Sequence, residues 1–149
     1  YACQRIYRDA RITSIYEGTT QLQTVAAIRY VTNGFYSSVI EDYAQMPVAS
    51  ELESVKARVA AMTEKFNHCV TLVKEAENQE LHDLCARHLY EMAADIIMCY
   101  LLMQNASKAP ELFAQSLQVF ANHSEAEVAK HTSLIERMSA EQVENYRQA

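Results

Sequence analysis

The chain has 149 residues, half of them hydrophobic, which is enough to bury the core of one domain. Its formal net charge of −6 repels nucleic-acid phosphates and anionic lipids, which argues against both as partners. It contains only two glycines and two prolines, where the pair usually makes up roughly 12% of residues, so we expect a few long helices and an all-α fold.

The first elements are short. Residues 1–12 are predicted to form the end of a helix, and residues 13–18 a turn. A second helix should begin at Thr19 or Thr20, since either hydroxyl can cap it. Asn33 and Gly34 then predict a turn or helix break, and residues 35–43 continue as helix. One side of the second helix carries Leu22, Val25, Ile28 and Val31.

Three long helices follow Pro47. Ser50 and Glu53 form a capping box for the first of them. Asn78 is the predicted cap of the second, and Pro110 should begin the third. The apolar pattern weakens at residues 122–125, which predicts a kink or break there. A second capping box, Ser139 with Gln142, opens a short last helix.

Apolar residues recur at spacings of three and four along each long helix, which predicts one buried stripe per helix. Long helices joined by short loops fold back on one another. We therefore predict an up-down antiparallel bundle of about four long helices plus short terminal helices, spanning about residues 35–138. A coiled coil between chains is less favoured, because several helices carry matching stripes. The stripes are Leu52, Val55, Val59, Met62, Phe66, Cys69, Val73 and Ala76; Leu81, Cys85, Leu89, Met92, Ile96, Cys99 and Met103; and Phe113, Leu117, Phe120, Val128, His131, Ile135 and Met138.

Cellular context is indicated by three further features. The four cysteines have no CxxC spacing, so we expect reduced thiols and a cytoplasmic protein rather than disulfides. The longest apolar stretch near the middle, residues 96–103, is far shorter than the ~20 residues needed to span a bilayer. The first methionine is Met46, so we expect the chain to begin inside a longer protein.

The segment richest in chemistry precedes the second helix. Tyr16, Glu17 and Gly18 stand together there, followed by two threonines and a glutamine at residues 19–21. A carboxylate at this place is stabilised by the helix dipole, and the hydroxyls and backbone N–H groups suit a polar or anionic ligand. On these residues alone, a solvated glutamate beside a helix end is the more frequent role.

A family resemblance favours a functional role for Glu17 over a solvated one. Residues 8–12 (RDARI) and 15–23 (IYEGTTQLQ) resemble the C-terminal signature of the acyl-CoA dehydrogenases, R-D-A-x-I followed by I-Y-E-G-T-x-Q-I-Q. Leu22 replaces an isoleucine, and Thr24 stands where arginine is common. The resemblance covers about residues 5–32. It implies an FAD-dependent enzyme that oxidises an acyl-CoA to the trans-2-enoyl-CoA and passes electrons to an electron-accepting flavoprotein.

The resemblance also implies residue roles. Glu17 matches the catalytic base, which removes the α-proton of the thioester while a hydride leaves the β-carbon for the flavin. Tyr16 and Gly18 match residues that border the substrate. The positions that approach FAD are Thr19, Thr20 and Gln21.

The resemblance further suggests a two-part organisation. Residues 1–34 would be the end of the catalytic helical domain, and residues 35–149 an additional C-terminal helical bundle. We expect this fragment alone to be inactive and to lack FAD. Its acidic charge favours a role in subunit assembly, hence a homo-oligomer. The alternative is a non-catalytic helical interaction domain whose first segment merely resembles the motif.

Two other groupings contain residue types that can bind a metal ion. His82, Cys85 and His88 are spaced by three, but residues six apart diverge by about 120° around a helix, so one helix cannot bring all three together. We expect a core Cys85 flanked by rim histidines and no metal. Glu91 and Asp95 are expected at the edge of a buried stripe, near Lys or Arg.

Overall fold

The computed structural model describes residues 2–14 and 20–148, and these ranges contain helices joined by short turns, with no β-strand. The predicted all-α fold is confirmed. In chain order the elements are α1 (Ala2–Arg11), the 3-10 helix η1 (Ile12–Ser14), α2 (Thr20–Thr32), α3 (Phe35–Gln45), the 3-10 helix η2 (Ser50–Leu52), α4 (Glu53–Glu75), α5 (Gln79–Lys108), α6 (Pro110–Arg137) and α7 (Ala140–Gln148).

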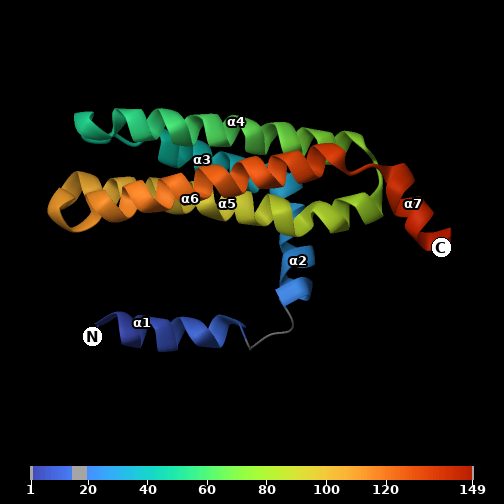
Figure 1. Cartoon of the computed structure of the whole chain (residues 1–149), viewed down its shortest axis with the longest axis horizontal. Coiled ribbons are helices and arrows are strands. Elements are labelled where there is room, and N and C mark those ends of the chain that lie inside the picture. The colour runs from blue at the N-terminus through green and yellow to red at the C-terminus, as the bar shows by residue number, and fades with distance from the viewer. Residues whose placement is uncertain (1, 15–19, 149) are drawn as a thin grey trace.

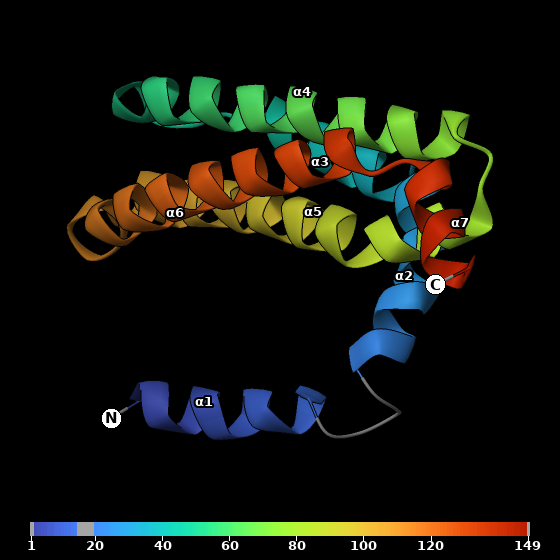
Figure 2. The same cartoon turned by 45° about the vertical axis from the view of Figure 1, so that its right-hand side comes forward.

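Helix α5 is the centre of the bundle and contacts α2, α3, α4 and α6. Figure 1 shows α4, α5 and α6 side by side with alternating chain direction, which confirms the up-down antiparallel arrangement. Helix α3 lies behind them, and α2 descends from the bundle. Figure 2 shows the short α7 turning away at the end where α4 connects to α5.

The core follows the predicted stripes closely. Phe66 on α4 and Leu89 on α5 are fully buried, and each such side chain contributes roughly 1.5–3 kcal/mol through removal from water. The ends of the stripes, such as Leu52 and Ala76, are only partly covered. The buried apolar residues of the three long helices are Val55, Val59, Met62, Phe66, Cys69, Val70, Val73, Leu81, Cys85, Ala86, Leu89, Met92, Ala93, Ile96, Cys99, Tyr100, Met103, Ala106, Leu117, Ala121, Val128 and Ile135.

The break predicted near residues 122–125 is wrong, because α6 runs unbroken from Pro110 to Arg137. Small side chains continue the buried stripe there: Ala121 and Ser124 are both fully buried. On the outer side, Arg58 of α4 donates to Glu125 Oε2 at 2.6 Å. Small residues let neighbouring helices approach closely, so the stripe persists without large apolar groups.

Two of the predicted helix starts are confirmed by hydrogen bonds. Asn78 Oδ1 accepts from the backbone N–H of Leu81 at 2.9 Å, which satisfies one free donor of α5. At α7, Ser139 Oγ accepts from the N–H of Gln142, and Gln142 Oε1 accepts from the N–H of Ser139, at 3.2 and 3.1 Å. These reciprocal bonds are a complete capping box. Pro110 occupies the first turn of α6, as predicted.

The capping box predicted at Ser50 is wrong. Residues 50–52 form η2, and α4 begins one turn later with Leu52 as its cap and no side-chain cap hydrogen bond. The N–H of Leu52 bonds instead to the carbonyl of Ala49 at 2.9 Å. A tight 3-10 turn therefore takes the place of the side-chain cap.

The turn predicted at Asn33 and Gly34 is confirmed. Gly34 has φ of 92°, a left-handed conformation that side-chain-bearing residues resist. Asn33 Oδ1 accepts from the N–H of Phe35 at 3.0 Å and so helps to start α3. This turn folds α3 back beside α2.

The two ends of α2 have different surroundings. Ile28 and Val31 are buried in the bundle core, whereas Thr20 and Leu22 are exposed. Beyond residues 15–19, every described side chain of α1 is exposed, and Figures 1 and 2 both show α1 standing apart from the bundle. The division of the chain at residue 34 stays a prediction.

All four cysteines are free: Cys69, Cys85 and Cys99 lie in the core, while Cys3 is exposed on α1. Burial raises the pKa of the Cys85 and Cys99 thiols to about 11, which keeps them protonated and unreactive. No helix within residues 2–14 and 20–148 is long and apolar enough to cross a bilayer.

Candidate functional site

The structure places only part of the motif. Tyr16, Glu17, Gly18 and Thr19 lie outside the described residues, so their predicted roles are not tested. Thr20 is the first residue of α2 and is exposed. The backbone of Gln21 lies in the same first turn, and its side chain is outside the described part of the chain.

The approach to the motif is shaped by local hydrogen bonds at the end of α1. Thr13 Oγ1 donates to the carbonyl of Ala10 at 2.6 Å, and Ser14 Oγ donates to the carbonyl of Arg11 at 2.9 Å. These hydroxyls satisfy carbonyls that a helix end leaves without partners. Thr13 and Ser14 thus stabilise the end of α1, directly before the residues of the motif.

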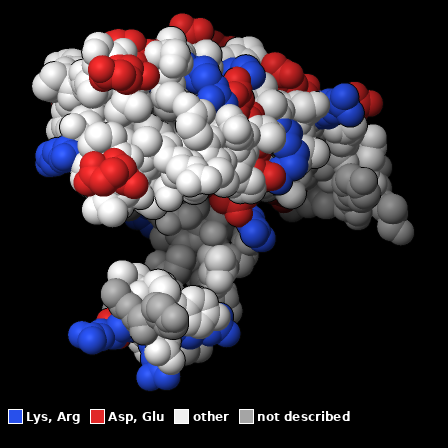
Figure 3. Space-filling view, turned by 60° about the vertical axis from the view of Figure 1, so that its left-hand side comes forward, with Lys and Arg blue, Asp and Glu red and all other residues white. Residues whose placement is uncertain are grey.

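Helix α1 is basic as well as apolar on its surface. It carries three arginines and a single acid, Asp9, and Figure 3 shows blue side chains around it in the lower part of the view. Ile6 and Tyr7 are about 70% exposed, at 68% and 71%. Exposed apolar groups of this size on one short helix are typical of a surface that another element covers.

A cavity of about 370 Å³ lies between this region and the bundle. We call it the junction cavity, because η1 and α2 line one side and tyrosines of α3 and α5 line the other. No sequence pattern pointed to these tyrosines, because Tyr36 and Tyr90 are 54 residues apart and only the fold brings them together. The lining residues are Thr13, Ser14, Thr20, Gln23, Thr24, Ala27, Tyr36 and Tyr90.

The two tyrosines form an aromatic wall. Their ring centroids are 6.5 Å apart with an interplanar angle of 80°, an edge-to-face arrangement. Burial, then the neighbouring Tyr90 and Tyr30, raise the pKa of Tyr36 above its usual value of 10.0. The Tyr36 hydroxyl is therefore protonated at neutral pH and can donate a hydrogen bond.

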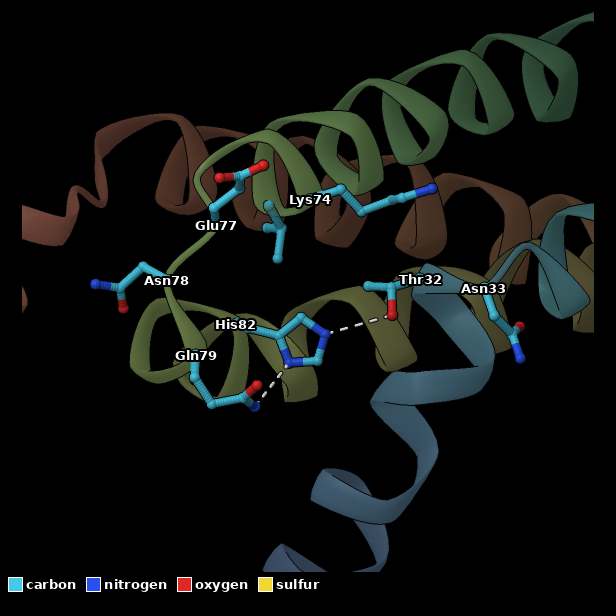
Figure 4. Close-up of a pocket in the computed structure, with 8 residues that line it drawn as sticks. Thr32, Asn33, Lys74, Glu77, Asn78, Gln79 and His82 are labelled. Carbon is cyan, nitrogen blue, oxygen red and sulfur yellow. Dashed lines mark hydrogen bonds between the residues drawn. The ribbon is translucent and has the colours of Figure 1, made fainter.

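A second cavity, of about 490 Å³, lies where the α2–α3 turn meets the α4–α5 connection. Figure 4 shows His82 between Thr32 and Gln79, with contacts of 3.3 Å from Nε2 to Thr32 Oγ1 and 3.5 Å from Nδ1 to Gln79 Nε2. Asn78 also lines it, but its side-chain oxygen caps α5. These bonds join α2 to α5 and cap the start of α5, so the polar groups have a structural role.

The histidine–cysteine series on α5 has three separate sets of neighbours. His82 contacts Thr32 on α2, while Cys85 is fully buried and its Sγ lies 3.6 Å from Met138 Sδ. His88 contacts His131 on α6. The prediction of a core cysteine flanked by rim histidines is confirmed, and the described residues hold no group of three or more metal-ligating side chains that could bind a metal ion.

A polar cluster that the sequence did not reveal joins α5 to α6. His88 Nδ1 and His131 Nδ1 are 2.9 Å apart, and His131 Nε2 is 3.2 Å from Glu91 Oε2. Because a carboxylate only accepts, His131 Nε2–H must donate to Glu91, so its Nδ1 is bare and accepts from His88 Nδ1–H. Glu91 in turn accepts from Arg87 Nε at 2.7 Å. The cluster links four side chains, with Glu91 as the acceptor for both Arg87 and His131.

Burial is the largest cause of the pKa shifts in this cluster. It lowers the pKa of both His88 and His131, because each imidazolium would be desolvated. Burial also raises the pKa of Asp95, one turn beyond Glu91. Both acids lie at the edge of the buried stripe, as predicted, with Arg87 beside Glu91.

Comparisons with known proteins decide the family. Residues 32–143 match the family model described as "Acyl-CoA dehydrogenase C terminal". The chain belongs to this family. The crystal structure of an acyl-CoA dehydrogenase family protein from Porphyromonas gingivalis has the same fold, with 36% sequence identity and a TM-score of 0.70. That match covers 76% of this chain and 97% of the other. None of the curated proteins matches.

The match and the motif are adjacent but separate. The family model begins at residue 32, inside the last turn of α2, covers α3 to α6 and ends within α7, at residue 143. The signature at residues 8–23 lies before it. The prediction of a C-terminal acyl-CoA dehydrogenase sequence, made on the signature, is therefore confirmed by a different part of the chain.

Proposed function

We propose that this chain is the C-terminal part of an FAD-dependent acyl-CoA dehydrogenase that converts an acyl-CoA to the trans-2-enoyl-CoA. The observation that carries the proposal is the IYEGTTQLQ segment, which leads directly into α2 of a chain that belongs to the acyl-CoA dehydrogenase C-terminal family. A random helix cap would not combine that segment with this family's bundle. We take Glu17 as the catalytic base.

The chemistry assigned to Glu17 is proton removal from a weak carbon acid. The α C–H bond breaks, its proton goes to the Glu17 carboxylate, and its electron pair forms the new double bond as a hydride leaves the β-carbon. Tyr16 and Gly18 would border the thioester. Enclosing the carboxylate beside an apolar acyl chain would raise its pKa towards the range that a useful base needs.

FAD supplies a hydride acceptor when it is bound in the full-length enzyme. Thr19, Thr20 and Gln21 would hold it. Their place suits that task, since Thr20 is exposed on the first turn of α2, where backbone N–H groups have no helical partner. An anionic, hydrogen-bonding group fits such a helix end.

Organisation and partners belong to the same proposal. Residues 1–34 would complete the catalytic helical domain, and residues 35–149 would be the additional bundle. The exposed apolar side chains of α1, with Ile12 and Leu22, need a covering surface, which supports a homo-oligomer. An electron-accepting flavoprotein would reoxidise the enzyme, in the cytoplasm.

The deciding experiment is Glu17→Gln in the full-length enzyme. Acyl-CoA should still bind, while flavin reduction followed by anaerobic stopped-flow absorbance slows by roughly 10²–10⁴, the usual contribution of a general base. Glu141→Gln is the matched control, because Glu141 is an exposed carboxylate in the first turn of α7. It should leave the rate unchanged.

The non-catalytic alternative predicts a different outcome. A glutamate that only stabilises a helix end would cost about 1 kcal/mol on replacement and leave the rate alone. If Glu17→Gln reduces its flavin within about tenfold of the wild-type rate, a tenth of the smallest effect expected of a base, Glu17 is not the base.

A further inference from the structure

A groove of about 640 Å³ lies on the surface of the bundle between α5 and α6. We call it the hairpin groove, because these two helices form an antiparallel hairpin, side by side in Figure 1. Leu112 and Val119 of α6 are 68% and 65% exposed in it, while Leu102 and Phe120 are only half-buried. Apolar side chains this open to water in one groove are typical of a surface that another element covers.

One end of the hairpin groove is acidic. Met98 and Asp95 lie four and seven residues before Leu102, on the same side of α5, and Met98 is 46% exposed. Asp95 is half-buried and forms no hydrogen bond or salt bridge with the described residues. Burial raises the pKa of its carboxyl, and the groups that act on it electrostatically are His123, Glu127, Glu91 and Lys130. A cation brought to this end would therefore stabilise the ionised carboxylate.

Helix α1 has the complementary character. Its apolar side is formed by residues spaced by three and four, all of them exposed: Cys3, Ile6, Tyr7 and Ala10. Arg11 follows one turn after Tyr7, so it stands at the edge of this apolar side, in the last turn of the helix. An apolar side bordered by a cation is what an apolar groove with an acidic end can bind.

Length and direction also agree. The ten residues of α1 span about 15 Å, and the groove runs about 16 Å along α6, from Leu112 to His123. If α1 lies parallel to α6 in the groove, Arg11 reaches the end where Asp95 lies. Glu111 is then beside the first turn of α1, where the helix dipole favours a carboxylate.

We propose that α1 of one copy of this chain binds in the hairpin groove of a second copy, with Arg11 paired to Asp95 of the partner subunit. Each copy has one such helix and one such groove, so a reciprocal exchange fills both grooves and gives a closed two-fold dimer. The inference rests on the homo-oligomer of the proposed function and names the surfaces that form it.

The first test is the dimer dissociation constant of the 149-residue chain, measured by analytical ultracentrifugation. Ile6→Glu and Val119→Glu should each raise this constant about tenfold or more, because the contact would bury an unpaired carboxylate. Leu84→Glu is the matched control, since Leu84 is an exposed leucine of α5 outside the groove, and it should stay within about threefold. All three positions are exposed, so circular dichroism should show an intact fold in each variant.

A charge reversal tests the proposed ion pair. Arg11→Glu and Asp95→Arg should each weaken the dimer, and the chain with both changes should recover most of the loss, because the pair is restored with opposite signs. Arg5→Glu is the matched control. It makes the same change of charge on the opposite side of α1, so its effect should be smaller than that of Arg11→Glu.

A mixture separates exchange between chains from other contacts. The Ile6→Glu chain keeps an intact groove, and the Val119→Glu chain keeps an intact α1. An equimolar mixture should therefore form a heterodimer at concentrations where each variant alone is monomeric. Binding of α1 to the groove of its own chain would give no heterodimer, and packing of groove on groove would leave the Ile6→Glu chain dimeric.

Four results would overturn the inference. They are a monomeric chain at about 1 mM, where even weak specific contacts associate, a dissociation constant that Ile6→Glu or Val119→Glu leaves unchanged, no recovery in the charge-reversed chain, and no heterodimer in the mixture. The outcomes are separable from those of Glu17, because dimerisation of this chain involves no proton removal. Slow flavin reduction in the Glu17→Gln enzyme with a monomeric chain keeps the proposed activity and rejects the exchange, and a normal rate with the exchanged dimer does the reverse.

Discussion

Helix α1 and the bundle are both amphipathic in sequence, yet the fold treats them differently. Phe66 and Leu89 of the bundle are fully buried, while Ile6 and Tyr7 of α1 remain about 70% exposed. The bundle covers its own apolar stripes, because each long helix lies against others with matching stripes. Among the described residues, the short α1 has no neighbouring helix that buries its apolar side chains. Most of the packing that stabilises the chain is therefore in the bundle. The exposed apolar side chains of α1 are available to pack against another surface.

The largest expected difference between α1 and the bundle is the loss of stability when a large side chain is removed from each. Phe66→Ala should lower the free energy of unfolding by about 3–5 kcal/mol, because it leaves a cavity among well-packed side chains. Tyr7→Ala, the matched change on α1, should stay within about 0.5 kcal/mol. Urea unfolding of this chain followed by circular dichroism measures both. Equal losses would show that α1 packs as tightly as the bundle does.

Acid should weaken the bundle through its histidine pair. Below the usual histidine pKa of 6.5 the unfolded chain binds protons at His88 and His131, while the folded chain, whose pKa values are lowered, does not. Stability is therefore full above pH 6.5 and falls as the pH drops below it, by at most about 1.4 kcal/mol per pH unit for each histidine. Protonating His131 also puts a hydrogen on the Nδ1 that accepts from His88.

Thermal unfolding between neutral pH and about pH 5.5, one unit below the usual histidine pKa, measures this effect. The groups facing the pair are Glu91 and Arg87 from α5 and Glu127 and Lys130 from α6. Asp95, whose pKa is raised by burial, acts in the opposite direction at lower pH. His88→Gln combined with His131→Gln should flatten the profile, whereas the exposed His123→Gln should not. An unchanged slope in the double variant would reject the pair as its origin.

The smallest expected loss of stability concerns the two predicted helix caps within the bundle. Asn78→Ala should cost about 1 kcal/mol, because the N–H of Leu81 loses its acceptor. Ser50→Ala should cost less than half of that, since a backbone turn replaces the cap there. The denaturant midpoints of the two variants, analysed with the same dependence of unfolding free energy on denaturant, measure both losses. A larger loss of stability for Ser50→Ala than for Asn78→Ala would show that Ser50 does cap α4.

The sequence alone determined the helices, their stripes and most of their ends. Stripe periodicity predicts which side of a helix is buried because the helical repeat is fixed, and Asn78, Pro110 and Ser139 act on their own first turns. Ser50 and residues 122–125 were predicted incorrectly. At Ser50 a 3-10 turn replaced the side-chain cap, and near residues 122–125 the small side chains of Ala121 and Ser124 continued the buried stripe.

Only the tertiary structure decided which distant residues meet. Tyr36 and Tyr90 share a cavity with Thr13 and Thr20, and His88 meets His131, because helices separated in sequence fold against each other. Periodicity assigns a residue to a face but does not say which face lies opposite it. The motif around Glu17 was found from sequence because its residues are contiguous. The aromatic wall of Tyr36 and Tyr90 was not, since these two residues are neighbours only through packing.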